Sequence, residues 1–231
     1  PFQGLRLHAS LSERSRFPAL RELYAGALDR FVPNPALRPE RAHTSEVGMT
    51  AVRGGWDVQV VGFAQRIDDA VVRTTLADRR FFRVNRDRFT SNGIEFTAGT
   101  MLGPVTARTD ITLQRARVQD ASLSTAAQRW PENVPAVFGS LTATGPMPGA
   151  IEGQARLRLM GSTRCAVGDV VNRQAGAATL DLVAERRWSA AGWWQRMRTT
   201  LQVENLFDQS LFDQCGLPQA GRTFRIGVAI G

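Results

Sequence analysis

The sequence predicts an all-β protein, an antiparallel transmembrane β-barrel, and three observations support this fold class. Apolar and polar side chains alternate strictly near the C-terminus, over residues 197–204 and again over residues 223–230. Such period-two alternation is the pattern of a β-strand with one apolar face. Several runs of this kind reach ten or more residues, whereas strands of soluble sheets have about five or six residues and about nine to eleven cross a bilayer at a tilt. No uninterrupted apolar stretch approaches the roughly 18 residues of a membrane helix.

Ten segments carry the strand pattern and are separated by turn residues. They are residues 3–12, 44–53, 56–76, 81–98, 104–118, 134–145, 150–161, 177–187, 196–205 and 222–231. Short connections are expected at residues 53–55, 99–103, 145–149 and 189–192, and longer ones at 12–43, 119–133, 162–176 and 206–221. The connection at residues 77–80 would lie at the same end of the sheet as the long loops, although it is itself short. Tight turns on one side and longer loops on the other are typical of outer-membrane barrels.

The segment 150–161 shows the expected facing most clearly. Its lipid-facing residues would be Ile151, Gly153, Ala155, Leu157 and Leu159, and its lumen-facing residues Glu152, Gln154, Arg156 and Arg158. A soluble β-sandwich would also alternate, with its apolar face inward, so alternation alone does not separate the two classes. Tryptophans beside the proposed short turns, where a membrane aromatic girdle belongs, add support for the barrel. They are Trp56, Trp188, Trp193 and Trp194.

The charge of the chain requires a separate explanation. Its formal net charge is +8, and all 29 basic residues are arginine. A nucleic-acid-binding module concentrates its positive charge on one face or stripe, whereas these arginines are scattered singly along strands and loops. We therefore expect no nucleic-acid partner. Lumen-facing arginines are expected to pair with lumen Asp and Glu residues, a role that suits the planar guanidinium group.

The sequence offers no catalytic site, no metal site and no cofactor site. The two histidines, His8 and His43, are far apart in sequence and have no Cys, Asp or Glu at metal-ligand spacing. Adjacent residues of a strand point to opposite faces, so the Asp68 and Asp69 pair cannot form a joint acid/base site. Nucleophile, phosphate-loop and zinc motifs are missing. The protein is expected not to be an enzyme.

Two multi-residue patterns resemble one family. The ending LQVENLFDQSLFDQCGLPQAGRTFRIGVAIG (residues 201–231) is similar to an NLFD turn, a loop and a closing GR-x-F strand. RFPALRELYAG (16–26) followed by FVPNPALRPERAHTSEVGM (31–49) resembles a long extracellular segment, and RVNRDRFTSNGIEF (83–96) resembles a third, weaker element. Together they resemble the C-terminal barrel of a TonB-dependent outer-membrane receptor.

That resemblance implies a partial barrel. Residues 1–231 would supply roughly the last ten strands of a barrel of about 22 strands, and the N-terminal plug and the TonB-contacting segment would be missing from this chain. Whether it is a natural truncation or a cropped fragment stays open. The last residues, Ala229, Ile230 and Gly231, depart from the aromatic ending usual for such barrels.

The implied function is uptake across the bacterial outer membrane. A receptor of this kind binds a scarce small molecule, here a ferric siderophore or another metal complex, and imports it with energy supplied by TonB; its other partner is outer-membrane lipid. The resemblance places the C-terminus on the periplasmic side and both cysteines outside the cell, where a disulfide between Cys165 and Cys215 is expected. Arginines of the outer segment are weak candidates for ligand contacts: Arg21, Arg30, Arg38 and Arg41. A passive porin and a soluble all-β binding module stay as alternatives.

Overall fold

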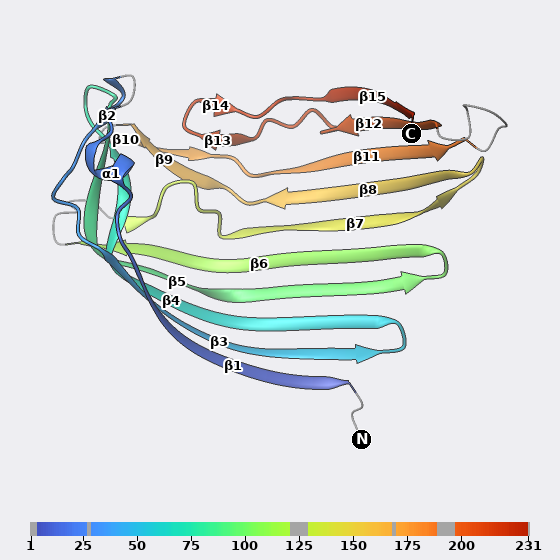
Figure 1. Ribbon diagram of the computed structural model, residues 1–231, viewed down its shortest axis with the longest axis horizontal. Coiled ribbons are helices and arrows are strands. Elements are labelled where there is room, and N and C mark those ends of the chain that lie inside the picture. The colour runs from blue at the N-terminus through green and yellow to red at the C-terminus, as the bar shows by residue number, and fades with distance from the viewer. Residues whose placement is uncertain (1–3, 27–28, 121–128, 168–169, 189–196, 231) are drawn as a thin grey trace.

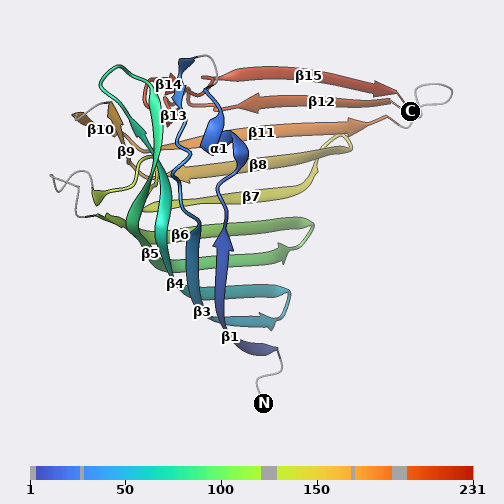
Figure 2. The same ribbon diagram turned by 60° about the vertical axis from the view of Figure 1, so that its left-hand side comes forward.

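The computed structural model describes residues 4–26, 29–120, 129–167, 170–188 and 197–230. Ten antiparallel strands follow one another in a single curved sheet, from β1 at one edge to β15 at the other (Figures 1 and 2). They are β1 (Leu5–Arg16), β3 (Glu40–Arg53), β4 (Trp56–Thr75), β5 (Phe81–Leu102), β6 (Val105–Gln119), β7 (Val137–Met147), β8 (Ile151–Met160), β11 (Ala177–Arg187), β12 (Met197–Glu204) and β15 (Thr223–Ile230). None of the helices within the described residues is long and apolar enough to cross a membrane.

The ten expected strands are confirmed, but several of their ends are wrong. β1 continues to Arg16 and β3 already begins at Glu40, because the two strands pair along their whole length. β5 runs through the expected turn at 99–103 as far as Leu102, and β7 runs through Gly145 as far as Met147. The expected turn at 189–192 lies outside the described residues.

The long connections contain short elements that the sequence did not indicate. They are α1 (Leu20–Tyr24) and β2 (Phe31–Val32) between β1 and β3, the hairpin β9 (Thr163–Val167) and β10 (Val170–Gln174) between β8 and β11, and the hairpin β13 (Phe212–Gln214) and β14 (Leu217–Pro218) between β12 and β15. The long connections lie at one end of the sheet, and the short turns lie at the other, where β1 begins and β15 ends (Figure 1). We call these two ends the loop end and the turn end.

The turn end is made of tight hairpins whose sequences fit their backbone. Arg53 pairs with Trp56 across a two-residue turn, and both central residues have positive φ, 57° at Gly54 and 84° at Gly55. Two successive positive φ values define the type I′ hairpin turn, which glycine adopts without a steric penalty. The register of β3 on β4 therefore follows directly from the Gly-Gly pair.

The two faces of the sheet differ in polarity, as the alternation predicted. Residues directly opposite one another form continuous rows across the strands, such as Met49, Val60, Phe96 and Ile111. On this apolar face the large side chains are exposed: Leu7 is 72% and Ile226 is 77% exposed. Apolar patches of this extent are not left in water by soluble monomers, whereas lipid covers them in a membrane barrel.

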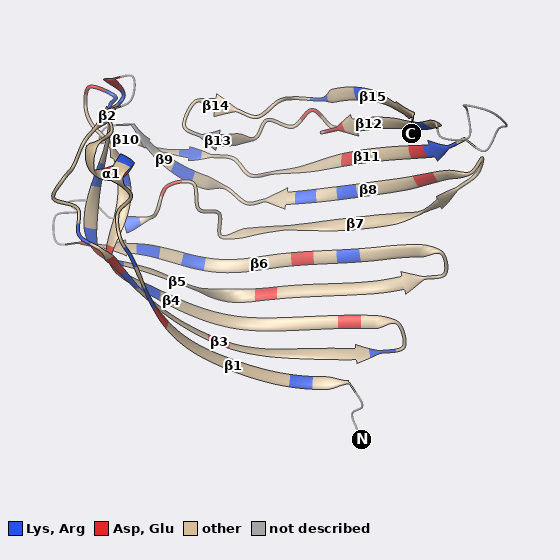
Figure 3. Cartoon of the chain, in the orientation of Figure 1, with Lys and Arg blue, Asp and Glu red and all other residues tan. Residues whose placement is uncertain are grey.

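The opposite, polar face carries ion pairs between neighbouring strands. Arg158 of β8 lies 3.0 Å from Asp181 of β11, and Arg225 of β15 lies 2.6 Å from Glu204 of β12. These pairs agree with the expectation that arginines on this face find acidic partners. Figure 3 shows basic and acidic residues dispersed along many strands rather than gathered on one element.

A packed core is found at the loop end rather than inside the sheet wall. The buried apolar residues among those described are Leu37, Ala70, Ala116, Val118, Cys165 and Leu211. All of them lie in the loop segments or in the strand portions nearest the loop end. The loops therefore pack against one another and against the strand ends, while the rest of the sheet is one layer thick.

The NLFD element is a hydrogen-bonded corner between β12 and β15. Asn205, with φ 51°, exchanges side-chain hydrogen bonds with the backbone of Gln209. The Oδ1 atom of Asp208 accepts a hydrogen bond of 2.8 Å from the backbone N–H of Arg222. A Cβ atom at Gly221 would lie 2.5 Å from that same oxygen, so a larger residue at this position would displace the carboxylate from its hydrogen bond to Arg222.

Candidate functional site

The segment that follows β1 is fixed to the loop end by a network of ionic contacts. Arg16 pairs with Glu40 and, at 2.8 Å, with Glu22 of α1. Glu22 also accepts a hydrogen bond of 2.9 Å from the backbone N–H of Ala19, which satisfies a donor at the start of the helix. Burial raises the pKa of Glu22. The hydrogen bond from Ala19 and the charges of Arg16 and Arg83 lower this pKa by more than burial raises it, so it lies below the ordinary value for a glutamate.

The second half of this segment is held by amides. Asn34 donates a side-chain hydrogen bond of 2.8 Å to the carbonyl oxygen of Arg83. Asn85 accepts from the backbone N–H of Arg38 and donates to its carbonyl oxygen. The two conspicuous sequence elements, RFPALREL and NPALRPE, thus act by attaching a long connection to β5. They bring residues 29–32 beside the loop-end parts of β4 and β5.

A pocket of about 640 Å³ opens at this place. Its walls come from the segment between β1 and β3, from the β4–β5 and β6–β7 connections, and from the β9–β10 and β13–β14 hairpins. Four arginines and one glutamate line it, which leaves three net positive charges: Arg30, Arg73, Arg79, Arg173 and Glu132. Within the described part of the chain, Arg30 and Arg79 form no ion pair with a carboxylate.

Phe81 forms an aromatic wall of this arginine pocket. The guanidinium carbon of Arg73 lies 4.4 Å from the Phe81 ring centroid, and that of Arg30 lies 5.7 Å away. Phe31 packs against the same ring with 5.3 Å between centroids. Cation–π contacts of this kind orient guanidinium groups without neutralising them. The pocket therefore presents oriented positive charge beside an apolar ring.

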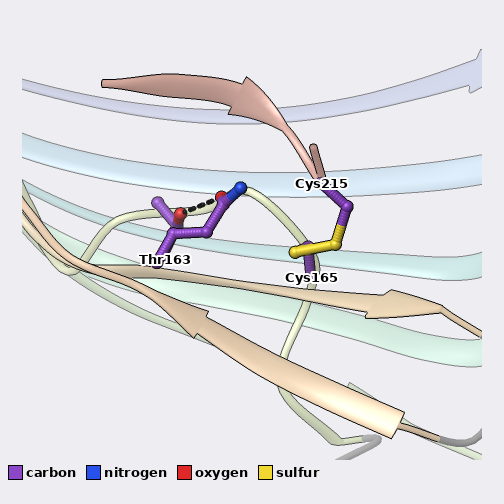
Figure 4. Close-up of a disulfide and its surroundings, with 4 residues drawn as sticks. Thr163, Cys165 and Cys215 are labelled. Carbon is purple, nitrogen blue, oxygen red and sulfur yellow. Dashed lines mark hydrogen bonds between the residues drawn. A yellow bond between two sulfur atoms is a disulfide. The ribbon is translucent and has the colours of Figure 1, made fainter. Parts of the chain in front are cut away.

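A disulfide closes one side of the arginine pocket. Cys165 of β9 is bonded to Cys215, which follows β13, as the sequence resemblance led us to expect. Their Cα atoms are 5.6 Å apart, and both residues line the pocket. Figure 4 shows the bond beside Thr163, whose hydroxyl donates a hydrogen bond of 2.9 Å to Gln174. The disulfide joins the β9–β10 hairpin to the β13–β14 hairpin, and the Thr163–Gln174 contact links β9 to β10.

Comparison with known proteins identifies the family. A family model described as "TonB dependent receptor-like, beta-barrel" matches residues 1–206. The chain belongs to this TonB-dependent receptor family. Its members are receptors and transporters rather than enzymes, and they are outer-membrane β-barrels. A search of curated protein sequences gave no match.

Solved structures of TonB-dependent receptors share the fold. The siderophore receptor PirA from Acinetobacter baumannii has a TM-score of 0.74 at 13% identity, over 97% of this chain and 38% of that one. The FrpB iron transporter from Neisseria meningitidis (F3-3 variant) has a TM-score of 0.69 at 19% identity, over 99% and 36%. The copper transporter OprC has 0.71 at 16%, over 97% and 36%. This receptor chain thus spans little more than a third of the length of these structures.

The four arginines singled out from the sequence lie at different places in the receptor chain. Arg30 lines the arginine pocket, Arg21 lies on α1, and Arg38 pairs with Asp69. Arg41 lies opposite Asp68 in a row of the apolar face. The pocket arginines contributed by β4, the β4–β5 turn and β10 were missed because no sequence pattern links these three places.

The histidines do not assemble a metal site in the described residues, where no group of three or more metal-ligating side chains occurs. The His8 imidazole lies against Gly48, where a Cβ atom would be 2.2 Å from it. His43 lies 3.9 Å from Glu13 and 4.0 Å from Asp68. Asp68 and Asp69 bind different arginines, Arg66 and Arg38, as expected for neighbours on a strand that serve separate structural contacts.

Proposed function

We propose that this chain forms part of the barrel wall of a receptor in the bacterial outer membrane, with its loop end facing outward, and that the receptor imports an anionic metal chelate such as a ferric siderophore. TonB would supply the energy through a plug and a TonB-contacting segment that lie outside residues 1–231. The chain would then contribute loop-end contacts to the ligand.

The arginine pocket is the observation that carries this proposal. Siderophores bind iron through anionic oxygens, and guanidinium groups recognise such oxygens with paired, charge-assisted hydrogen bonds. Three net positive charges in a pocket of about 640 Å³ match a small anion better than a neutral sugar or a cation. The Phe81 ring beside Arg73 offers a stacking surface for an aromatic chelating group.

The names of related structures favour the same ligand class. They include the ferric-catecholate import receptor Fiu from E. coli K12, the ferric yersiniabactin uptake receptor FyuA from Yersinia pestis, and the transporters of iron and copper compared above. Family membership also favours an active receptor over the passive porin and the soluble binding module that the sequence left open.

The test is ligand binding by the complete receptor that contains these residues. Purified in detergent, it would be titrated with a panel of ferric siderophores while its tryptophan fluorescence is recorded. The double variant R30Q/R79Q should weaken binding about tenfold or more, since each lost charge-assisted hydrogen bond contributes about 1.5–3 kcal/mol.

The matched control is R6Q/R53Q, which removes two charges near the turn end and should bind as the native protein does. Equal affinity of R30Q/R79Q and the native receptor for every chelate that binds would contradict the pocket assignment. If no member of the panel bound, the ligand class itself would be wrong.

A further inference from the structure

The apolar face changes character within one row of residues toward the loop end. The row Val47, Gly62, Ile94 and Leu113 is apolar, and the next row toward the loops is Ser45, Ala64, Asn92 and Arg115. The two rows beyond contain His43, Arg66, Thr90 and Arg117, then Arg41, Asp68, Arg88 and Gln119. Rows of one face are about 6.6 Å apart, so the change from apolar to basic is abrupt.

Five arginines of this face form what we call the basic belt: Arg41, Arg66, Arg88, Arg115 and Arg117. Two carboxylates face them from the same side, Asp68 on β4 and Glu13 on β1, so the belt keeps three net positive charges. Figure 3 shows basic residues on β4 and β6 toward the ends remote from the turns. A basic surface bordering an apolar one suits contact with anionic lipid headgroups.

The charges of the basic belt are unequally compensated. Asp68 is shared by Arg66, at 2.9 Å, and Arg88, at 3.3 Å. Within the described ranges, Arg115 and Arg117 form no ion pair. Arg117 instead lies over the Trp130 ring, which Arg164 approaches to 4.3 Å from its centroid. Among the described residues, Arg115 and Arg117 therefore add positive charge on β6 that no carboxylate pairs with.

A groove of about 680 Å³ lies directly beneath this part of the belt. Small residues Gly62 and Ala64 line it between the larger Val47, Ile94 and Leu113, and Arg115 borders it. All six belong to the two rows at the boundary of the apolar face. An acyl chain fits such an apolar depression, while a phosphate attached to the same molecule would reach the arginines.

We propose that the basic belt and this groove form a binding site for a phosphorylated lipid of the outer leaflet, with its phosphate on Arg115 and Arg117 and an acyl chain over Gly62. The inference rests on the proposed membrane location of the receptor but not on its proposed ligand. In this proposal the basic belt binds a lipid of the surrounding membrane, whereas the arginine pocket binds the transported ligand. An experiment can therefore contradict either assignment without contradicting the other.

The experiment is native mass spectrometry of the complete receptor, released from detergent in the presence of diphosphorylated lipid A, with the dephosphorylated lipid as the comparison probe. R115Q/R117Q should retain at least tenfold less diphosphorylated lipid than the native protein. The control R108Q/R156Q removes the same charge from the polar face and should retain the native amount. The chelate affinity of both variants should be unchanged.

A second variant tests the groove. A Cβ atom at Gly62 would have its nearest neighbour 3.9 Å away, so the backbone has room for a side chain at this position, and G62I places a branched apolar side chain in the groove. Lipid retention should fall several-fold while the phosphate preference persists.

Three results would overturn the lipid site. These are equal retention by R115Q/R117Q and the native protein, equal retention of the dephosphorylated lipid, and displacement of the lipid by an equal concentration of inorganic phosphate. The last result would mean that the arginines bind phosphate alone. Loss of chelate binding by R115Q/R117Q with unchanged lipid retention would likewise contradict the separation of the two sites.

Discussion

Arginines on the two faces of this sheet have different neighbours. On the polar face, Arg158 and Arg225 lie within 3.0 Å of carboxylates on the adjacent strand. On the apolar face, Arg115 and Arg117 occur only beyond the last apolar row, and neither has a carboxylate partner within the described residues. Arg158 and Arg225 thus join neighbouring strands, whereas Arg115 and Arg117 mark the edge of the membrane-exposed surface.

Placing an arginine within the apolar rows should have the largest effect on stability. I111R adds a charge to the apolar face, whereas T112R adds it to the polar face of the same strand, directly opposite Glu95. I111R should lower the free energy of unfolding by about 2–4 kcal/mol, the depth-dependent penalty of a lipid-facing charge. T112R should leave it nearly unchanged. Urea unfolding of the complete receptor in lipid vesicles measures both, and equal effects would refute the assignment of faces.

A smaller effect is expected from removing a carboxylate of the polar face. Asp181 pairs with Arg158 and also accepts a hydrogen bond of 2.9 Å from the backbone N–H of Asn205. D181A leaves that donor without its partner and should reduce the free energy of unfolding by about 1–3 kcal/mol. D181N keeps an acceptor oxygen and should recover most of the loss. If D181N were as unstable as D181A, the charge rather than the corner hydrogen bond would be the important contribution.

The stability of α1 at the loop end should depend on pH. Because the folded-state pKa of Glu22 is lowered, its contribution to stability is present above the pKa of the unfolded chain and is lost as pH falls through the folded value. The protection factors of the α1 amides, which are corrected for the intrinsic exchange rate at each pH, should therefore fall between about pH 5 and pH 3. E22Q should exchange faster at neutral pH and show much less of this dependence. A native profile that is flat over the same range would contradict the role of the Arg16–Glu22 contact.

The smallest effect is expected for an exposed ion pair of the polar face. R225Q removes the partner of Glu204 at the edge strand β15. Exposed pairs contribute about 0–1 kcal/mol, so the urea midpoint should hardly move. A loss comparable to that of D181A would show that β15 depends on this pair for docking.

The strands could be predicted from the sequence because a sheet with one apolar and one polar face requires apolar and polar residues to alternate along each strand. Leu157 and Arg158, for example, point to the faces expected of them. The loop end could not be predicted in the same way. α1 and β2 depend on contacts between residues distant in the chain, such as Arg16 with Glu40, and these contacts have no periodicity.

The candidate sites show the same limit. The basic belt becomes visible only when the registers of β3 to β6 align Arg66 with Arg117, because each arginine alone is one of many scattered charges. The arginine pocket combines residues from five connections that are far apart in sequence. Of its arginines, Arg30 could be proposed from the sequence because it lies in a conspicuous loop segment.

The disulfide between Cys165 and Cys215 joins residues separated by 50 positions, and the ring it closes contains β10, β11, β12 and β13. A protease could cut a loop inside this ring without separating the two pieces of the chain. On a non-reducing gel the nicked protein would migrate as one species, and a reductant would be needed to reveal the cut. The bond thus keeps the barrel wall connected across such a cut.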